Sequence, residues 1–218
     1  YPPIVKMFHN AEGEKYTKDV EKAKKLLDEA GLKDKDGDGL REDKNGNKLT
    51  FNFAIRNTGQ DFDQALADTF IKSWKEVGLD VKLVDGKLMA PKDWSQRVQG
   101  DDPGIDIFQG AWGLATDPNA SSLVGKSSPL NLQRYTTEEI QKSLDAMTSN
   151  DMFDDKKLVE AYQKFDKQFR EDAAWLPFSW KSDLTWVNKR IKNLDVVKLD
   201  LGTQKLYELE LTADAPAK

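Results

Sequence analysis

Residues 51–83 read FNFAIRNTGQDFDQALADTFIKSWKEVGLDVKL and carry both periodicities of regular secondary structure. Apolar residues first alternate with polar or small ones, as in a half-buried strand, at Phe51, Phe53 and Ile55. Apolar residues then recur at helical spacing, at Phe62, Leu66, Phe70, Trp74 and Val77. Gly78, which follows, is a signal for the end of a helix. Alternation returns at Leu79, Val81 and Leu83. A strand, a helix of ~17 residues and a second strand predict a βαβ unit with parallel strands and a right-handed crossover.

The segments on either side of this unit extend the same pattern. Before it, Thr17 is placed to cap a helix and Gly31 to end it, and one face of that helix carries Val20, Ala23, Leu27 and Ala30. After it, a short helix is expected over residues 91–99. The apolar run 105–112 then predicts a strand that is covered on both faces, as in an α/β layer. A long irregular stretch, residues 113–135, follows the carboxyl end of that strand.

The last third of the chain predicts two helices and several short strands. The helices are expected around residues 140–147 and 158–169, where apolar residues recur at helical spacing. Short strands are expected at 175–180 and 184–187, and again at 197–201 and 209–211 around a turn at Gly202-Thr203. The predicted fold class is therefore α/β, a mostly parallel sheet flanked by helices, with a C-terminal β extension.

Composition excludes several classes of partner. The 218 residues are 38% hydrophobic and 33% charged, which is typical of a globular chain, and no apolar run approaches the ~20 residues of a membrane span. The net charge is −5, with 33 basic residues interleaved among 38 acidic ones, so nucleic acid is not expected as a partner. Cysteine is absent, which removes disulfides and thiolate sites and indicates little about the compartment. Because the sequence begins Tyr1-Pro2-Pro3 without an initiator methionine, we interpret it as a fragment.

No set of catalytic residues is evident. His9 is the only histidine, no G-x-S-x-G elbow is present, and the phosphate-binding motifs G-x-x-x-x-G-K-[ST] and G-x-G-x-x-G are missing. A catalytic pair chosen among 38 carboxylates would have no specificity. The sequence therefore predicts a protein that is not an enzyme.

An acidic loop is the most specific short motif. Residues 34–43 read DKDGDGLRED and match an EF-hand loop at positions 1, 3, 5, 6 and 9, with Gly39 as the turn glycine. The candidate ligands are the carboxylates Asp34, Asp36, Asp38 and Glu42. Position 12 is Asn45, which cannot supply the bidentate carboxylate of a tight calcium site. Two interpretations stay open: a weak structural calcium site, or a metal-free turn in which Asp and Gly supply the required backbone angles.

A second candidate site follows the strand predicted at 105–112. Because ligands of α/β sheets tend to bind beyond the carboxyl ends of strands, the residues of this segment that combine aromatic, charged and amide groups are candidates for ligand binding. They are Trp112, Asp117, Asn119, Asn131, Arg134 and Tyr135. An aromatic ring, a carboxylate and a guanidinium could hold a zwitterionic ligand by stacking and charge-assisted hydrogen bonds. In the alternative, Trp112 fills the core and Arg134 is a solvated surface residue.

Several ordered segments resemble one known family. The segment KAKKLLDEAGLKDKDGDGLRED, residues 22–43, followed by Leu49-Thr50-Phe51, looks like the start of the second lobe of oligopeptide-binding proteins, the solute receptors of ABC importers. Later segments agree in order, and the resemblance covers nearly the whole chain: Asp106-Ile107-Phe108, Gly110-Ala111-Trp112, Asp117-Pro118, Asn131, Arg134-Tyr135, Leu176-Pro177-Phe178, Asp183-Leu184 and Val187-Asn188-Lys189-Arg190. The resemblance implies a periplasmic-binding-protein-like lobe.

The same resemblance implies a function and a domain organisation. Residues 1–188 would form the C-terminal ligand-binding lobe of a two-lobe receptor that closes around a peptide by hinge bending, and residues 189–218 would return to the other lobe. The implied partners are a peptide, the N-terminal lobe of the same protein and the permease subunits of an ABC importer. The implied location is extracytoplasmic, as a cell-surface lipoprotein of a Gram-positive bacterium or in a periplasm. Nickel, sugar or signalling-peptide ligands remain open within the family.

One position departs from the family's pattern. In dipeptide and enteric oligopeptide receptors, an aspartate three residues after the strand-end tryptophan pairs with the peptide's amino terminus, and here that position is Ala115. Asp117 lies two residues further on and is the candidate substitute. Two alternatives from other classes are a calcium-stabilised structural or adhesion domain, and a hydrolase of glycans or peptides.

Overall fold

The computed structural model describes residues 1, 5, 7–9, 16–113, 119–149, 153–180, 186–193 and 206–212. The chain divides into two compact units. One is Glu14–Trp112, called here the sheet unit, and the other combines Tyr1–Gly13 with Gly113–Lys218 and is called the helical unit. None of the helices in the described ranges combines the length and the apolar character of a membrane-crossing helix.

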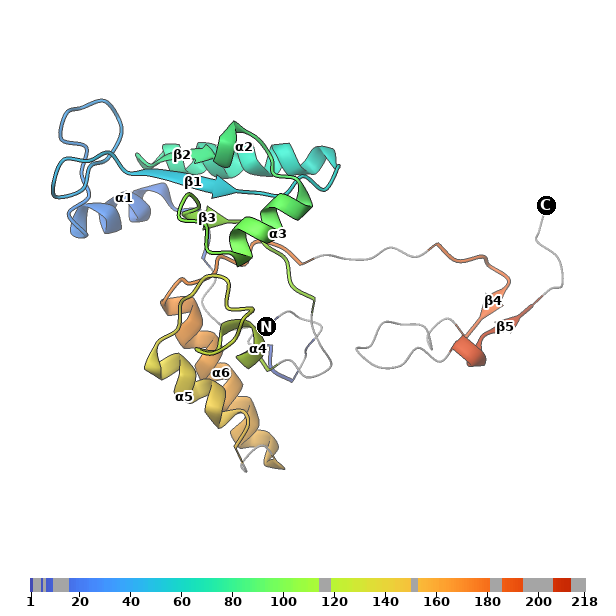
Figure 1. Ribbon diagram of the computed structural model, residues 1–218. Coiled ribbons are helices and arrows are strands. Elements are labelled where there is room, and N and C mark those ends of the chain that lie inside the picture. Colours follow the sequence, from blue (N-terminus) through green and yellow to red (C-terminus); the bar gives the residue numbers. More distant parts are fainter. Residues whose placement is uncertain are drawn as a thin grey trace. The chain divides into compact units, whose positions relative to one another are not determined.

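Three parallel strands form the centre of the sheet unit. They are β1 (Thr50–Ala54), β2 (Asp80–Leu83) and β3 (Ile107–Phe108), in the order β2-β1-β3 (Figure 1). Phe51 of β1 pairs with Val81 of β2, and Phe53 pairs with Ile107 of β3. The helix α2 (Asp61–Lys75) connects β1 to β2. The predicted βαβ unit is confirmed.

The core of this unit lies between the sheet and α2. Four buried residues form it: Phe53 of β1, Ile55 just after β1, Ala67 of α2 and Val81 of β2. Trp74 lies edge-on to Phe53 at 5.3 Å between ring centroids and stacks on Phe70 at 5.4 Å. The helix is capped by reciprocal bonds between Gln60 and Asp63. Aromatic residues at helical spacing thus cover the alternating face of the strands.

Two shorter helices complete the sheet unit. Helix α1 (Val20–Glu29) ends before Gly31, whose φ of +79° suits a left-handed C′ residue. Its cap is Asp19, whose side chain accepts a hydrogen bond from the Lys22 amide, so the prediction of Thr17 as the cap was wrong. A 3₁₀ turn η1 (Val84–Gly86) leads to α3 (Pro91–Gln99), which has the predicted bounds.

The strand predicted over 105–112 is much shorter than expected. Only Ile107–Phe108 is extended and paired, and both residues are half-buried rather than covered on both faces. The reason is its place at the edge of the described sheet, where β1 is its only partner and ends at Ala54. A strand can pair only as far as its neighbour extends.

The helical unit contains α4 (Ser121–Val124), α5 (Glu138–Ala146) and α6 (Asp155–Glu171). Helices α5 and α6 run side by side (Figure 1). Thr137 and Asp154 cap them through side-chain bonds to backbone amides. Their facing apolar residues form a second core with Val5, Phe8 and Val124: Ile140, Leu144, Met147, Tyr162, Phe165 and Phe169. Both helices were predicted from these apolar positions.

The C-terminal part is less regular than predicted. Residues 175–180 form no strand, and the apolar side chains of Leu176, Phe178 and Trp180 are exposed, because no described strand pairs with this segment. A short antiparallel pair, β4 (Ile191–Lys192) with β5 (Glu210–Leu211), follows, with the 3₁₀ turn η4 (Leu206–Glu208) before β5. The strand predicted at 197–201, its turn at 202–203 and residues 184–185 lie outside the described residues.

Candidate functional site

An open pocket lies beyond the carboxyl ends of β1 and β2. Its volume is about 430 Å³, which is within the usual range for small-molecule sites. Three segments line it: Asn57 just after β1, residues 85 and 87–90 after β2, and Asp93, Gln96 and Arg97 of α3. Carboxyl ends of parallel strands are the usual place for ligands in α/β sheets. The sequence pointed to the strand end at Trp112, so these lining residues were not predicted, although Asn57 directly follows a predicted strand.

Arg97 is the fixed cation of this pocket. Its guanidinium contacts the carboxylates of Asp85, at 2.6 Å, and Asp102, at 2.5 Å. Hydrogen bonds to Asp102 and then Asp85 raise the pKa of Arg97, and the guanidinium in turn holds the pKa of Asp102 below its usual value. Because Asp85 and Asp102 are both paired with Arg97, the guanidinium is not an uncompensated positive charge at the pocket.

A stacked pair lies near the same end of the sheet. The Arg56 guanidinium carbon is 4.9 Å from the centre of the Trp94 ring, and Trp94 meets Phe108 edge-on at 5.9 Å. The Arg56 Nε and Trp94 Nε1 groups are both buried without a hydrogen-bond partner among the described residues. Since buried N–H groups are nearly always paired in proteins, these two donors carry an uncompensated desolvation cost.

Trp112 is the one predicted ligand-binding residue in the sheet unit. It lies four residues beyond β3, and its side chain is 39% exposed, so it does not fill the core. An exposed ring at a strand end is free to stack on a ligand. Asp117 and Ala115 lie outside the described residues, so the substitute for the amine-binding aspartate stays a prediction.

The two asparagines that were predicted to bind ligand form hydrogen bonds with the backbone of the helical unit. The Asn119 side chain accepts a hydrogen bond from the Ser121 amide at the start of α4. The Asn131 amide nitrogen lies 3.2–3.3 Å from the carbonyl oxygens of Val124, Gly125 and Tyr135. Its carbonyl oxygen is buried and has no hydrogen-bond partner in the described structure. Both residues hold the irregular segment in shape, and their binding of ligand stays a prediction.

Arg134 and Tyr135 follow Asn131 on the same segment. Arg134 has a φ of +53°, and its guanidinium donates to the Leu132 carbonyl at 2.5 Å. Tyr135 is 37% exposed, and burial raises the pKa of its phenol, with a further contribution from the Asp172 carboxylate. The structure thus brings Asn131, Arg134 and Tyr135 together on one turn, where their role in binding stays a prediction.

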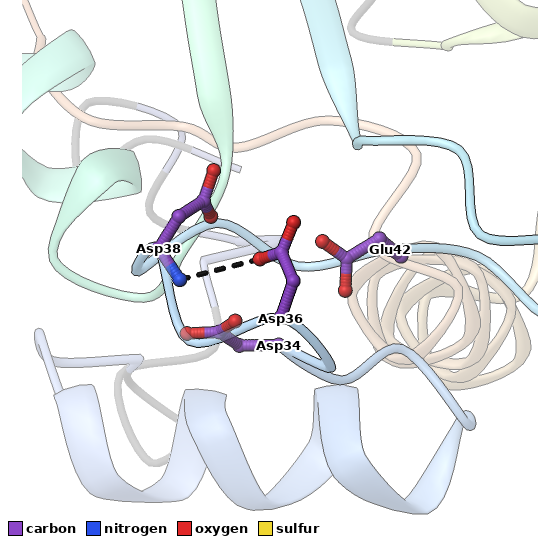
Figure 2. Close-up of side chains that lie close together, drawn as sticks. All are labelled: Asp34, Asp36, Asp38 and Glu42. Carbon is purple, nitrogen blue, oxygen red and sulfur yellow. Dashed lines mark hydrogen bonds between the residues drawn. The ribbon is translucent and has the colours of Figure 1, made fainter.

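The acidic loop is the second predicted site, and its four carboxylates come together. One oxygen from each of Asp34, Asp36, Asp38 and Glu42 lies within 4.8 Å of the others. Figure 2 shows the four side chains gathered by the turn of the loop. Oxygens that share one calcium ion at about 2.3–2.6 Å lie at most about 5 Å apart, so this spacing suits a divalent cation.

A cation of the protein itself also lies in this cluster. The Lys48 ammonium is 2.7 Å from Asp36, 2.8 Å from Asp38 and 2.6 Å from Glu42. Asn45, at the twelfth loop position, has an amide in place of the carboxylate of a calcium loop. The donors of a calcium loop are therefore present, but a lysine competes for them, and the predicted calcium stays a prediction.

Comparison with known proteins identifies the family. The family described as bacterial extracellular solute-binding proteins, family 5 Middle, matches residues 1–132, which is more than half of the chain. The chain belongs to this family. The predicted relationship to oligopeptide-binding receptors is confirmed, and so is the periplasmic-binding-protein-like fold class.

Individual relatives match nearly the whole chain. The oligopeptide-binding protein OppA of Lactococcus lactis subsp. lactis strain IL1403 is 32% identical over 221 residues, which is 99% of this chain and 36% of that protein. The structure of lactococcal OppA complexed with an endogenous peptide in the closed conformation superposes with a TM-score of 0.75 at 31% identity, over 79% of this chain and 32% of that one.

A third match carries a different ligand. The structure of a periplasmic oligopeptide-binding protein of Thermotoga maritima, with bound mannohexaose, has a TM-score of 0.61 at 25% identity, over 81% of this chain and 32% of that one. The present chain spans about a third of the length of the curated relatives it matches.

Proposed function

We propose that this chain is part of the substrate-binding component of an ABC importer and contributes one side of an oligopeptide-binding cleft. The observation that carries the proposal is the likeness, along almost all of the chain, to lactococcal OppA, which is described with a peptide enclosed in its closed conformation. The pocket beyond β1 and β2, which is lined by polar and charged side chains, is in keeping with this role.

The arrangement of the whole receptor follows from the same likeness. Residues 1–188 would form the ligand-covering lobe, residues 189–218 would return to the other lobe, and a hinge between the lobes would close them around the peptide. The receptor would act outside the cytoplasm, as a cell-surface lipoprotein or in a periplasm, and would deliver its ligand to the permease subunits. A lobe alone would bind poorly, because half of the cleft is missing.

The proposed function includes no chemistry on the ligand. The only histidine, His9, contacts a backbone carbonyl through Nδ1 at 2.7 Å, and cysteine is absent from the sequence. Neither a nucleophile paired with a base nor a metal-activated water is therefore part of the proposal. Proteins of this family act as receptors, and capture followed by release is sufficient for that role.

An oligosaccharide is the second candidate ligand, because the Thermotoga maritima relative is described with mannohexaose. The two classes make different demands on the site. A peptide presents charged ends and backbone amides, which suit fixed carboxylates and guanidinium groups, whereas a sugar presents hydroxyls and apolar ring faces for stacking on aromatic rings.

The test uses the full-length receptor in two steps. First, the purified protein is denatured, and whatever it releases is identified by mass spectrometry. Next, the emptied protein is titrated by calorimetry with a random peptide pool and, in parallel, with manno-oligosaccharides. We expect released peptides and micromolar or tighter peptide binding. Sugar binding without peptide binding would replace the peptide by the second candidate, and binding of neither would refute the assignment.

A further inference from the structure

Lys48 occupies an unusual position for a lysine beside a turn. Its ammonium lies within 2.8 Å of Asp36, Asp38 and Glu42, and its side chain is only 32% exposed. Glu42 is almost fully buried, at 4% side-chain exposure. The ammonium donates hydrogen bonds to both oxygens of Asp36, at 2.8 and 2.7 Å, and forms ion pairs with Asp38 and Glu42. The arrangement is therefore a closed cation site whose cation belongs to the chain.

The carboxylates that Lys48 contacts are those that a calcium loop would use. Asp36, Asp38 and Glu42 stand at loop positions 3, 5 and 9. Position 1, Asp34, turns its two oxygens to the amides of Gly37 and Gly39, at 2.7 and 2.9 Å. The ammonium thus contacts three of the four carboxylates that a metal would use, and the fourth, Asp34, is bonded to backbone amides.

The backbone brings Lys48 to this place. Glu42 forms antiparallel bridges with both Lys33 and Lys48, so the residue before the acidic loop and the residue after it lie on either side of Glu42. Between Glu42 and Lys48 in the sequence, Asp43 accepts hydrogen bonds from the amides of Asn45 and Asn47 and closes a separate turn. This turn contains the twelfth loop position and is followed directly by Lys48.

We propose that the Lys48 ammonium is the resident cation of the acidic loop and holds it closed in the place where a calcium loop holds its ion. A tethered ammonium is present at high effective concentration, so calcium could enter only by displacing it from three carboxylates.

The consequence reaches the rest of the sheet unit. The loop that Lys48 closes also carries Arg41, whose guanidinium donates to Asp28 and to the Leu32 carbonyl near the end of α1, and to the Val77 carbonyl after α2. Closing the loop thus fastens α1 and α2 at the amino-terminal end of the sheet. In this proposal, the fastening needs no metal.

The experiment compares thermal unfolding in a chelator and in millimolar calcium for the full chain and two variants. Lys48→Gln removes the ammonium, and Lys44→Gln removes an exposed charge from the same loop as a matched control. We expect the parent and Lys44→Gln to melt at the same temperature in both buffers. Lys48→Gln should melt lower in chelator and regain about 3–5 °C in calcium, because the uncompensated carboxylates can then bind the ion.

Two results would overturn the proposal. One is a calcium-dependent rise in the melting temperature of the parent, which would make the loop a metal site. The other is a folded Lys48→Gln variant that is indifferent to calcium. If Lys48→Gln fails to fold, a nuclear magnetic resonance titration of the parent decides. Under the proposal, calcium leaves the Gly37 and Gly39 amide signals and the Lys48 ammonium signal unmoved, whereas saturable shifts of these signals would contradict it.

Discussion

The two ends of the three-stranded sheet differ in how far their polar groups are paired within the chain. At the amino-terminal end, residues 33–48 form a loop in which Arg41 and Lys48 meet carboxylates and carbonyls at 2.5–2.8 Å. At the carboxyl end, the buried N–H groups of Arg56 and Trp94 have no partner among the described residues, and their chain neighbours Asn57 and Asp93 line an open pocket.

This difference distinguishes polar groups that stabilise the fold from polar groups that can bind a ligand. Polar groups that satisfy one another hold elements together and have nothing left for a ligand, whereas buried donors without a partner carry a desolvation cost that a ligand or water can relieve. Substitutions at the amino-terminal end should therefore change stability and leave peptide affinity unchanged, and substitutions at the carboxyl end should do the reverse.

The largest effect is expected from Arg41→Met. Arg41 is buried and donates to the buried Val77 carbonyl, to the partly buried Leu32 carbonyl and to the exposed Asp28 carboxylate, so its loss leaves the two carbonyls without this partner. We expect the free energy of unfolding to fall by about 3–4 kcal/mol, measured by urea denaturation followed by circular dichroism. Lys44→Met in the same loop is the control and should change it by less than about 0.5 kcal/mol. Equal losses in both variants would remove the distinction on which the comparison rests.

The next largest effect is expected from two glycines that share a positive φ angle but differ in their surroundings. Gly78 and Gly46 have φ of +87° and +86°, but a Cβ at Gly78 would lie 2.8 Å from the Arg41 Cγ, whereas nothing lies within 4 Å at Gly46. We expect Gly46→Ala to cost about 1 kcal/mol of unfolding free energy and Gly78→Ala about 2–3 kcal/mol. The same denaturation curves measure both, and matching losses would mean that Arg41 is free to move aside.

The sequence predicted the secondary structure of the sheet unit well, because apolar periodicity decides which face of an element is buried. The βαβ unit and the bounds of α3 followed from it. It could not give the length of β3, since that depends on where β1 ends in space. It also placed the four carboxylates of the loop but not Lys48, because a lysine fourteen residues after Asp34 carries no local signal of contact.

Trp112→Ala tests the carboxyl end directly. Its ring is partly exposed after β3, so its removal should cost little stability. If it stacks on the peptide, the dissociation constant of the full-length receptor for its peptide should rise about tenfold, or ~1.4 kcal/mol, by calorimetry. Trp186→Ala is the matched control, because that ring is 94% exposed. Unchanged affinity in Trp112→Ala would move the recognition surface away from this strand end.

The smallest effect sharpens the comparison, because it concerns a carboxylate at the carboxyl end that is held by hydrogen bonds within the chain. Asp63, in the first turn of α2, accepts hydrogen bonds from the Thr58 amide at 2.6 Å and the Thr58 hydroxyl at 2.8 Å. Burial raises the pKa of Asp63, but the bonds from Thr58 and Gln60 outweigh it and leave that pKa below its usual value.

A carboxyl group with a lowered folded-state pKa stabilises the protein above its unfolded-state pKa of about 3.9, and the contribution is lost as the pH falls through the folded-state value. Asp63→Asn should therefore lower the melting temperature at pH 7 and weaken its decline below about pH 4, whereas Asp61→Asn, at the exposed start of the same helix, should keep the parent's acid limb. If the melting temperatures of Asp63→Asn and the parent fell equally at low pH, the bonds from Thr58 would not favour the charged form of the Asp63 carboxyl group. Peptide affinity should stay unchanged in Asp63→Asn, since a group whose acceptors are already occupied at this end belongs to the scaffold and not to the site.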